Sequence, residues 1–64
     1  MTYTVFIYKD DLPLSQEGFS DVQQAFAYLG ELDLKTDVQR CILDNGIRIL
    51  FDLTRDENGD LTST

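Results

Sequence analysis

Carboxylates are the only side chains with reactive or ligand chemistry that this sequence holds in number. It has 12 Asp and Glu residues, no His, and Cys41 as its one cysteine. Without His the chain lacks the usual general base near neutral pH and the commonest metal ligand. Cys41 has no disulfide partner and no evident activating base, so we interpret it as a small buried hydrophobe. We therefore expect neither redox nor nucleophilic chemistry from Cys41.

Paired carboxylates can still do acid–base work, but only in a cleft that separates their pKa values. A chain of 64 residues has little room for such a cleft. The segment DENGD at residues 56–60 resembles the opening of a calcium loop. Its glycine falls at the fourth position, whereas an EF-hand needs it at the sixth, and no glutamate closes the site. We expect a β-turn there, and no enzyme activity, metal site or cofactor.

The charge balance indicates the kind of partner instead. Twelve acidic against five basic residues give a net charge of -7 and a pI near 4.1. Such a surface repels nucleic acid and anionic membranes and attracts basic partners, although acidity that serves solubility alone is the alternative. No apolar run approaches the ~20 residues of a membrane span, and the start MTYTVFIYKDD lacks the positive region of a signal peptide. We expect a soluble, cytoplasmic protein.

The elements that must position these charges begin with a strand and a helix. Residues 2–8, TYTVFIY, alternate and are rich in β-branched and aromatic residues, which indicates a strand. The following KDDLPLSQEG reads as a loop, because it contains Pro13 and Gly18. Ser20 and Gln23 form a capping box, and the helix it opens carries Val22, Ala25, Phe26 and Leu29 on one face. Gly30 can end this helix, although Leu32 also fits the apolar stripe.

The stretch TDVQRCILDNG from Thr36 repeats the capping residues of SDVQQAFAYLG from Ser20, so residues 37–44 could form a second helix. Asn-Gly at 45–46, between two apolar runs, favours a β-hairpin instead. A two-residue turn there pairs Ile42 with Ile49 and places Val38, Ile42, Ile47, Ile49, Phe51 and Leu53 on an inner face that Arg40 interrupts. We favour the strand for residues 37–44 and keep the helix as the alternative.

The predicted fold is α+β, with the element order β-α-β-β. Residues 47–54 are the most apolar strand and take the centre of a three-stranded antiparallel sheet of order 1-3-2, with the helix on one face. Residues 1–64 form a single small acidic domain whose tail is poorly ordered beyond about residue 59. We expect a monomer, with a dimer as the alternative.

In this fold the carboxylates gather at two poles. The predicted partner-binding group lies at the pole of the helix C-terminus and comprises Glu31, Asp33, Asp37, Asp52, Asp56, Glu57 and Asp60. Local structure explains this pole poorly, because Glu31 and Asp33 oppose the helix dipole and Asp37 lies diagonal to Asp52. A secondary partner-binding group, Asp10, Asp11 and Glu17, lies at the other pole near Asp21 and Asp44. The sequence does not decide which pole binds.

An apolar patch offers a second type of contact. Phe6, Tyr8, Cys41, Leu43 and Leu50 would line the sheet face away from the helix, unless the LPL segment at residues 12–14 covers them. A protein that used this patch would be a general interaction module, such as an antitoxin-like or regulatory subunit. Binding through the carboxylates should weaken steeply with salt, and binding through the patch should not.

The small size, the low pI, the absence of His and the lone Cys41 resemble those of small phage-encoded anti-CRISPR proteins. In character the chain is similar to the acidic inhibitors of type I-C interference, and no sequence motif carries the likeness. This resemblance implies a stoichiometric inhibitor that mimics DNA and occupies a basic nucleic-acid-binding surface, such as that of the PAM-reading subunit of a CRISPR surveillance complex. Seven net charges correspond to ~12 Å of duplex DNA.

Overall fold

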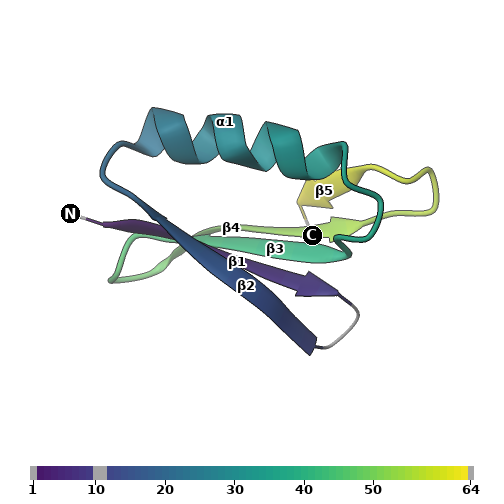
Figure 1. The fold of residues 1–64 in the computed structure, drawn as a ribbon, viewed down its shortest axis with the longest axis horizontal. Coiled ribbons are helices and arrows are strands. Elements are labelled where there is room, and N and C mark those ends of the chain that lie inside the picture. Colours follow the sequence, from purple (N-terminus) through teal and green to yellow (C-terminus); the bar gives the residue numbers. More distant parts are fainter. Residues whose placement is uncertain (1, 10–11, 64) are drawn as a thin grey trace.

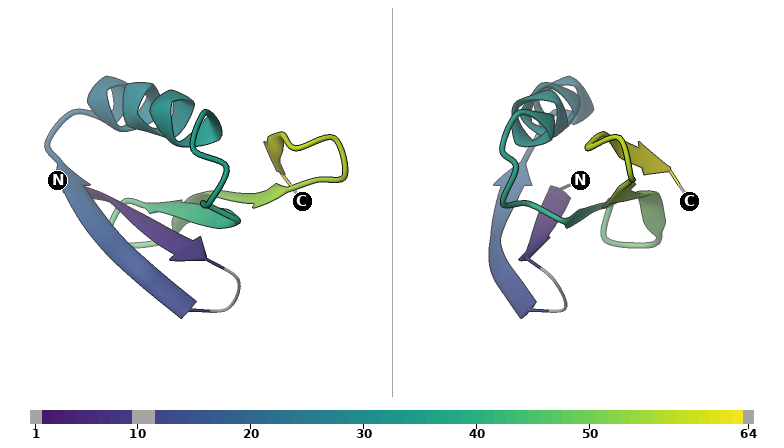
Figure 2. Two further views of the ribbon diagram at one scale, coloured as in Figure 1. Left: turned by 45° about the vertical axis from the view of Figure 1, so that its right-hand side comes forward. Right: turned by 90° about the vertical axis from the view of Figure 1, so that its right-hand side faces the viewer.

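A computed structural model describes residues 2–9 and 12–63. The elements are strands β1 (Tyr3–Lys9) and β2 (Leu12–Phe19), helix α1 (Val22–Asp33), and strands β3 (Arg40–Asp44), β4 (Ile49–Arg55) and β5 (Leu61–Ser63) (Figure 1). All strands belong to one antiparallel sheet of order β2-β1-β3-β4-β5. α1 lies across one face and packs chiefly on β1 and β2 (Figures 1 and 2). The predicted class, one helix on an antiparallel sheet, is confirmed.

The predicted strand number and order are wrong. The sheet has five strands, and β3 lies between β1 and β4. The prediction instead places the strand after the hairpin, which is β4, beside the first strand. The central position suits β3 because its Cys41 and Leu43 are fully buried and need cover from both sides. Residues 61–63, which the sequence analysis places in a poorly ordered tail, form β5 against the end of β4.

The segment predicted as a loop is strand β2. It pairs with β1 from Tyr3 opposite Phe19 to Lys9 opposite Leu12, with an irregularity between Ile7 and Tyr8. Every residue of β2 except Phe19 is exposed. An exposed edge strand needs no apolar alternation and tolerates Pro13, so neither of the usual sequence signals marks it.

The Asn-Gly hairpin exists, but its predicted register is wrong. The loop spans residues 45–48 and is held by side chains: Asn45 Oδ1 accepts hydrogen bonds from the backbone N–H groups of Ile47 and Arg48, both at 2.9 Å. With the longer loop and an irregularity at Leu43, Ile42 lies opposite Asp52 rather than Ile49. Such a shift exchanges the faces of a strand.

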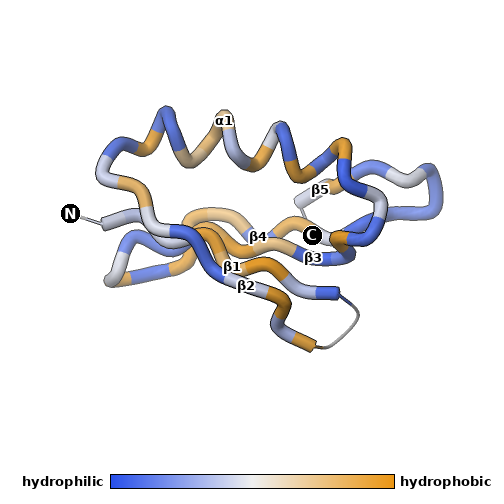
Figure 3. The backbone as a smooth tube through the Cα atoms, viewed as in Figure 1, coloured by the Kyte–Doolittle hydropathy of each residue, from blue (hydrophilic) through white to orange (hydrophobic). Residues whose placement is uncertain are grey.

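The exchange of strand faces determines which side chains form the core. Eight residues are buried between α1 and the sheet: Val5, Ile7, Ala25, Leu29, Leu32, Val38, Cys41 and Leu43. Cys41 is a small buried hydrophobe, as predicted, but it lies on the helix side together with Leu43. Ile47 and Ile49, expected inside, are 81% and 55% exposed. Figure 3 shows the apolar character concentrated in the central strands, with the turn between β4 and β5 hydrophilic.

α1 differs from its prediction at both ends. Its N-cap is Asp21 rather than Ser20, since Asp21 Oδ1 accepts from the backbone N–H of Gln23 at 2.8 Å. The helix also continues past Gly30 to Asp33 and thereby buries Leu32. The helical alternative for residues 37–44 is wrong, because Arg40–Asp44 is strand and the residues before it form a turn.

Two glycines give a matched test of this backbone. Gly46 has a φ of 92°, and Gly30 lies inside α1, where a Cβ would meet no atom within 4 Å. Gly46→Ala should lower the free energy of unfolding by about 1 kcal/mol, because Ala is strained at positive φ. Gly30→Ala should raise it by about 0.5–1 kcal/mol through helix propensity. Urea unfolding of both variants checks this, and equal effects of one sign would contradict the assigned backbone.

Candidate functional site

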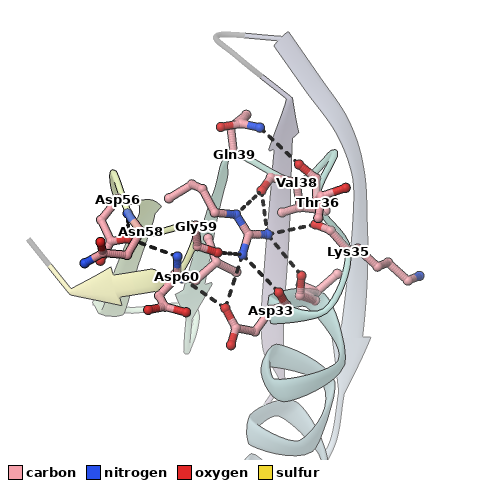
Figure 4. Close-up of polar contacts among 12 residues, drawn as sticks. Asp33, Lys35, Thr36, Val38, Gln39, Asp56, Asn58, Gly59 and Asp60 are labelled. Atoms are coloured by element: carbon pink, nitrogen blue, oxygen red, sulfur yellow. Dashed lines mark hydrogen bonds and ion pairs between the residues drawn. The ribbon is translucent and has the colours of Figure 1, made fainter.

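The predicted partner-binding carboxylates come mainly from three segments, which are the end of α1, the connection at residues 34–39 and the turn at residues 56–60. The structure brings these segments to one end of the molecule (Figures 1 and 4). We call this region the acidic end and define it by Glu31, Asp33, Asp37, Asp56, Glu57 and Asp60. Asp52 does not belong to it, because it lies opposite Ile42 within the sheet.

The side chain of Arg55 holds the acidic end together and is only 8% exposed. Its Nη2 donates to the carbonyl oxygens of Lys35 at 2.7 Å and of Val38 at 2.9 Å, and its Nε donates to Val38 at 3.1 Å. Its Nη1 donates to the carbonyl oxygens of Asp33 and Gly59, both at 2.9 Å. One guanidinium therefore joins the helix end, the connection and the turn.

Arg55 also resolves an electrostatic problem of α1. The last carbonyls of a helix lack internal partners and carry partial negative charge, and α1 has no basic residue in its last turn. Arg55, distant in sequence, donates to the carbonyl of Leu32 at 3.4 Å as well as to that of Asp33. A cation at this place offsets the acidic residues Glu31 and Asp33 at the negative end of the dipole.

Three of the predicted binding carboxylates have structural tasks. Asp33 Oδ1 accepts from Arg55 Nη1 at 3.2 Å and from the backbone N–H of Leu61 at 3.0 Å, which anchors β5 to the helix end. Asp56 Oδ1 accepts from the backbone N–H groups of Asn58 and Asp60, both at 2.9 Å, and so closes the turn. These two side chains would be needed for folding whether or not the protein bound a partner.

The third is Asp52, which forms a two-pronged ion pair with Arg40 on the sheet face away from α1. Arg40 Nε lies 2.9 Å from Asp52 Oδ1, and Nη2 lies 2.5 Å from Oδ2. The hydrogen bonds from Arg40 hold the pKa of Asp52 below its usual value. Arg40 therefore lies on the sheet face away from the core and does not interrupt it. Asp52 is attracted to Arg40, whereas the sequence predicts a repulsion between Asp52 and Asp37.

The other four carboxylates of the acidic end have no such task. Glu31, Asp37, Glu57 and Asp60 are all exposed. Within residues 2–9 and 12–63, no hydrogen bond or ion pair occupies the side chain of any of the four. Lys35 is an exposed cation of the same region. The acidic end thus presents a net negative surface that folding does not use.

Of the secondary group, the structure describes only Glu17. Asp10 and Asp11 lie outside the described residues. Because β2 returns the chain along β1, the start of α1 lies beside the start of β1 rather than its end, and Glu17 is opposite Val5. Asp21 caps α1, and Asp44 Oδ1 accepts from the N–H of Gly46 at 2.5 Å, so both carboxylates have local roles in the fold.

The charges of Glu17 and Glu31 both act on Tyr28, which packs at the β2 side of the helix. Tyr28 packs against Phe19 with their ring centroids 5.3 Å apart. Partial burial raises the pKa of Tyr28, and the negative charges of Glu17 and Glu31 raise it further. Two carboxylates that the sequence analysis assigned to opposite poles therefore act on one hydroxyl.

Cys41 is the buried titratable group of the core. Burial raises the pKa of its thiol from 9.0 to about 11; the charge of Arg55 lowers it, and the charges of Asp52 and Asp33 raise it. The thiol is therefore protonated near neutral pH. Within the described residues there is no pocket and no group of three or more potential metal ligands. No helix in the described part of the chain has the length and apolar character needed to span a membrane.

The chain matches no protein-family model, no curated protein and no solved structure. Arg55, the central residue of the acidic end, is not among the site residues that the sequence predicts. The sequence nevertheless holds a signal for Arg55. Leu53 and Arg55 are two residues apart in β4 and therefore lie on the same face of the strand. A strand that places Leu53 against the core thus directs Arg55 toward the helix side as well.

Replacing the two arginines separately tests the task of Arg55. Arg55→Met should lower the free energy of unfolding by about 2–5 kcal/mol, because the partly buried carbonyls of Leu32 and Val38 lose their donor. Arg40→Met removes the same charge from an exposed ion pair and should cost only about 1 kcal/mol or less. Chemical unfolding gives both values. Equal, small losses would show that the Arg55 contacts do not hold the acidic end.

Cys41 makes stability depend on alkaline pH. A thiol with a pKa of about 11 in the folded protein and 9.0 when unfolded favours the folded state fully below pH 9.0, and this contribution is lost as the pH rises toward 11. The wild-type protein should therefore lose stability across this range by more than Cys41→Ala does. Urea unfolding at intervals between neutral pH and pH 11 measures the difference. Parallel curves for the two proteins would contradict the raised pKa.

Proposed function

We propose that the protein is a stoichiometric binding protein that occupies a basic, nucleic-acid-binding surface of another protein through its acidic end. One observation carries the proposal: Glu31, Asp37, Glu57 and Asp60 are exposed at one end of the molecule, and folding uses none of them within the described residues. Concentrating like charges costs stability through self-repulsion. A basic partner is the contact that recovers this cost.

The size of the molecule supports a nucleic-acid-like role. It measures 34 × 21 × 19 Å. Its length is therefore close to one helical turn of B-DNA, ~34 Å. Carboxylates on such a body can stand in for phosphates at a surface that normally holds a short stretch of duplex. On the resemblance in size and charge, CRISPR effector subunits that read the PAM are the first targets to test.

Capture from a host lysate at low salt, followed by elution with rising salt, identifies the target. The double variant Glu57→Gln/Asp60→Asn should then weaken binding to that target by roughly 2- to 30-fold, because two charge contacts are lost. Gln23→Lys/Gln24→Lys changes the net charge by the same amount at exposed positions near the start of α1, and it should change affinity much less. Titration calorimetry with the purified target compares them.

Competition with DNA decides the mode of binding. Duplex DNA and this protein should exclude one another from the target, and the affinity should fall steeply as salt is raised. A complex that holds target, DNA and this protein together would refute nucleic-acid mimicry. Equal affinities of the two double variants would show that net charge, and not the acidic end, attracts the partner.

The sheet face away from α1 supports a second candidate function, an interaction module that binds through apolar contacts. The predicted patch is divided in the structure, because Cys41 and Leu43 lie on the helix side. Phe6, Tyr8 and Ile42 on this face are only half-buried. β2 does not cover them, because it pairs with β1 as the edge strand of the sheet. Affinity that is insensitive to salt and falls on Phe6→Ala would favour this candidate.

A further inference from the structure

The outer edge of the sheet at β2 is open. β2 is the first strand in the sheet order, and no strand of the described residues lies beyond it. An edge strand presents a row of backbone N–H and C=O groups that can pair with another extended chain. The views in Figure 2 show β2 as the outermost ribbon on its side, with α1 above it.

Only part of this edge is protected against pairing. The irregularity between Ile7 and Tyr8, together with Pro13, interrupts the strand near its start. From Ser15 to Phe19 the pairing with β1 is regular. The regular part is long enough to accept a short added strand, since typical strands have about five or six residues.

Charge distinguishes the partner that fits this edge. Glu17 lies opposite the core residue Val5, so its side chain is on the helix side of the sheet. Tyr28, packed on Phe19, lies on the same side, and Glu31 follows Tyr28 by one turn of the helix. Neither glutamate has an ion pair within the described residues. A residue opposite Glu17 in an added strand would face that carboxylate, on the side of the sheet that also carries Tyr28 and the charge of Glu31.

We propose that residues 15–19 of β2 bind an extended segment of a partner protein as an added antiparallel strand, with Lys or Arg at the position facing Glu17. A second copy of this chain is a poor occupant, because symmetric pairing about Glu17 opposes the two glutamates and brings together two molecules of net charge -7. The contact goes beyond the proposed function: it also takes a basic segment, but it uses the backbone groups of β2, and Glu31 is the one carboxylate of the acidic end that lies beside it.

The probe is a synthetic peptide of about eight residues in which Lys and Val alternate. One control replaces every Lys by Glu, and a second carries N-methyl groups on two adjacent central residues, which blocks pairing on both of its edges. Hydrogen exchange of the labelled protein is followed by NMR. The Lys peptide should slow exchange at alternate amides of residues 15–19, and neither control peptide should do so. Slowing that is absent, or that the N-methylated peptide reproduces, overturns the proposal.

Two charge reversals test the position of the contact. Glu17→Lys should weaken binding of the Lys peptide by roughly 2- to 30-fold, because an attractive cross-strand pair becomes repulsive. Glu57→Lys makes the same change in charge at the acidic end and should alter binding at β2 by no more than about twofold. Equal losses would overturn the proposal and indicate attraction by net charge alone.

The two proposals fail separately. If the captured target depends on Glu57 and Asp60 but the Lys peptide leaves the exchange of residues 15–19 unchanged, the strand contact is wrong and the acidic end remains the binding surface. If residues 15–19 are protected by the Lys peptide while DNA and the captured target bind together with this protein, the strand contact holds and nucleic-acid mimicry is wrong.

Discussion

The contact on which this fold depends most is the guanidinium of Arg55 among the carbonyls at the end of α1. Arg55 is the fixed positive charge that the helix terminus lacks locally, and it lies at the junction of the connection and the turn. Arginine suits this position because its five donors point in fixed directions and it does not lose its proton. A small core is thereby supplemented by a polar network at one end, which joins α1, the turn at residues 56–60 and β5.

The network divides the carboxylates into two classes. Five of those described act within the fold, as helix cap, turn closure, anchor or ion pair: Asp21, Asp33, Asp44, Asp52 and Asp56. The remaining five are exposed and unused by the fold within the described residues: Glu17, Glu31, Asp37, Glu57 and Asp60. Net charge alone would treat all ten as equivalent. In the structure, only the second class of the described carboxylates is exposed without a task in the fold, and it lies at the acidic end and along the β2 side of α1.

The sequence predicts elements whose signals are local. β1 and α1 follow from alternation and from helical spacing, and the Asn-Gly pair marks the hairpin loop. β2 was missed because a strand exposed along its length has no apolar period. The register failed because the Asn45 side chain closes a longer loop than a two-residue turn. Arg55 was missed as a site residue because its partners are 4 to 23 residues away in sequence.

The position of Arg55 in the chain also bears on how the protein forms during synthesis. Residues leave the ribosome in order, at about 5–20 per second. α1 emerges well before Arg55, so for a time its last carbonyls and Asp33 have no guanidinium to bind, and β3 has only β1 beside it. The end of α1 and the far half of the sheet therefore both depend on residues that are made late, since β4 supplies the guanidinium to the one and the next strand to the other.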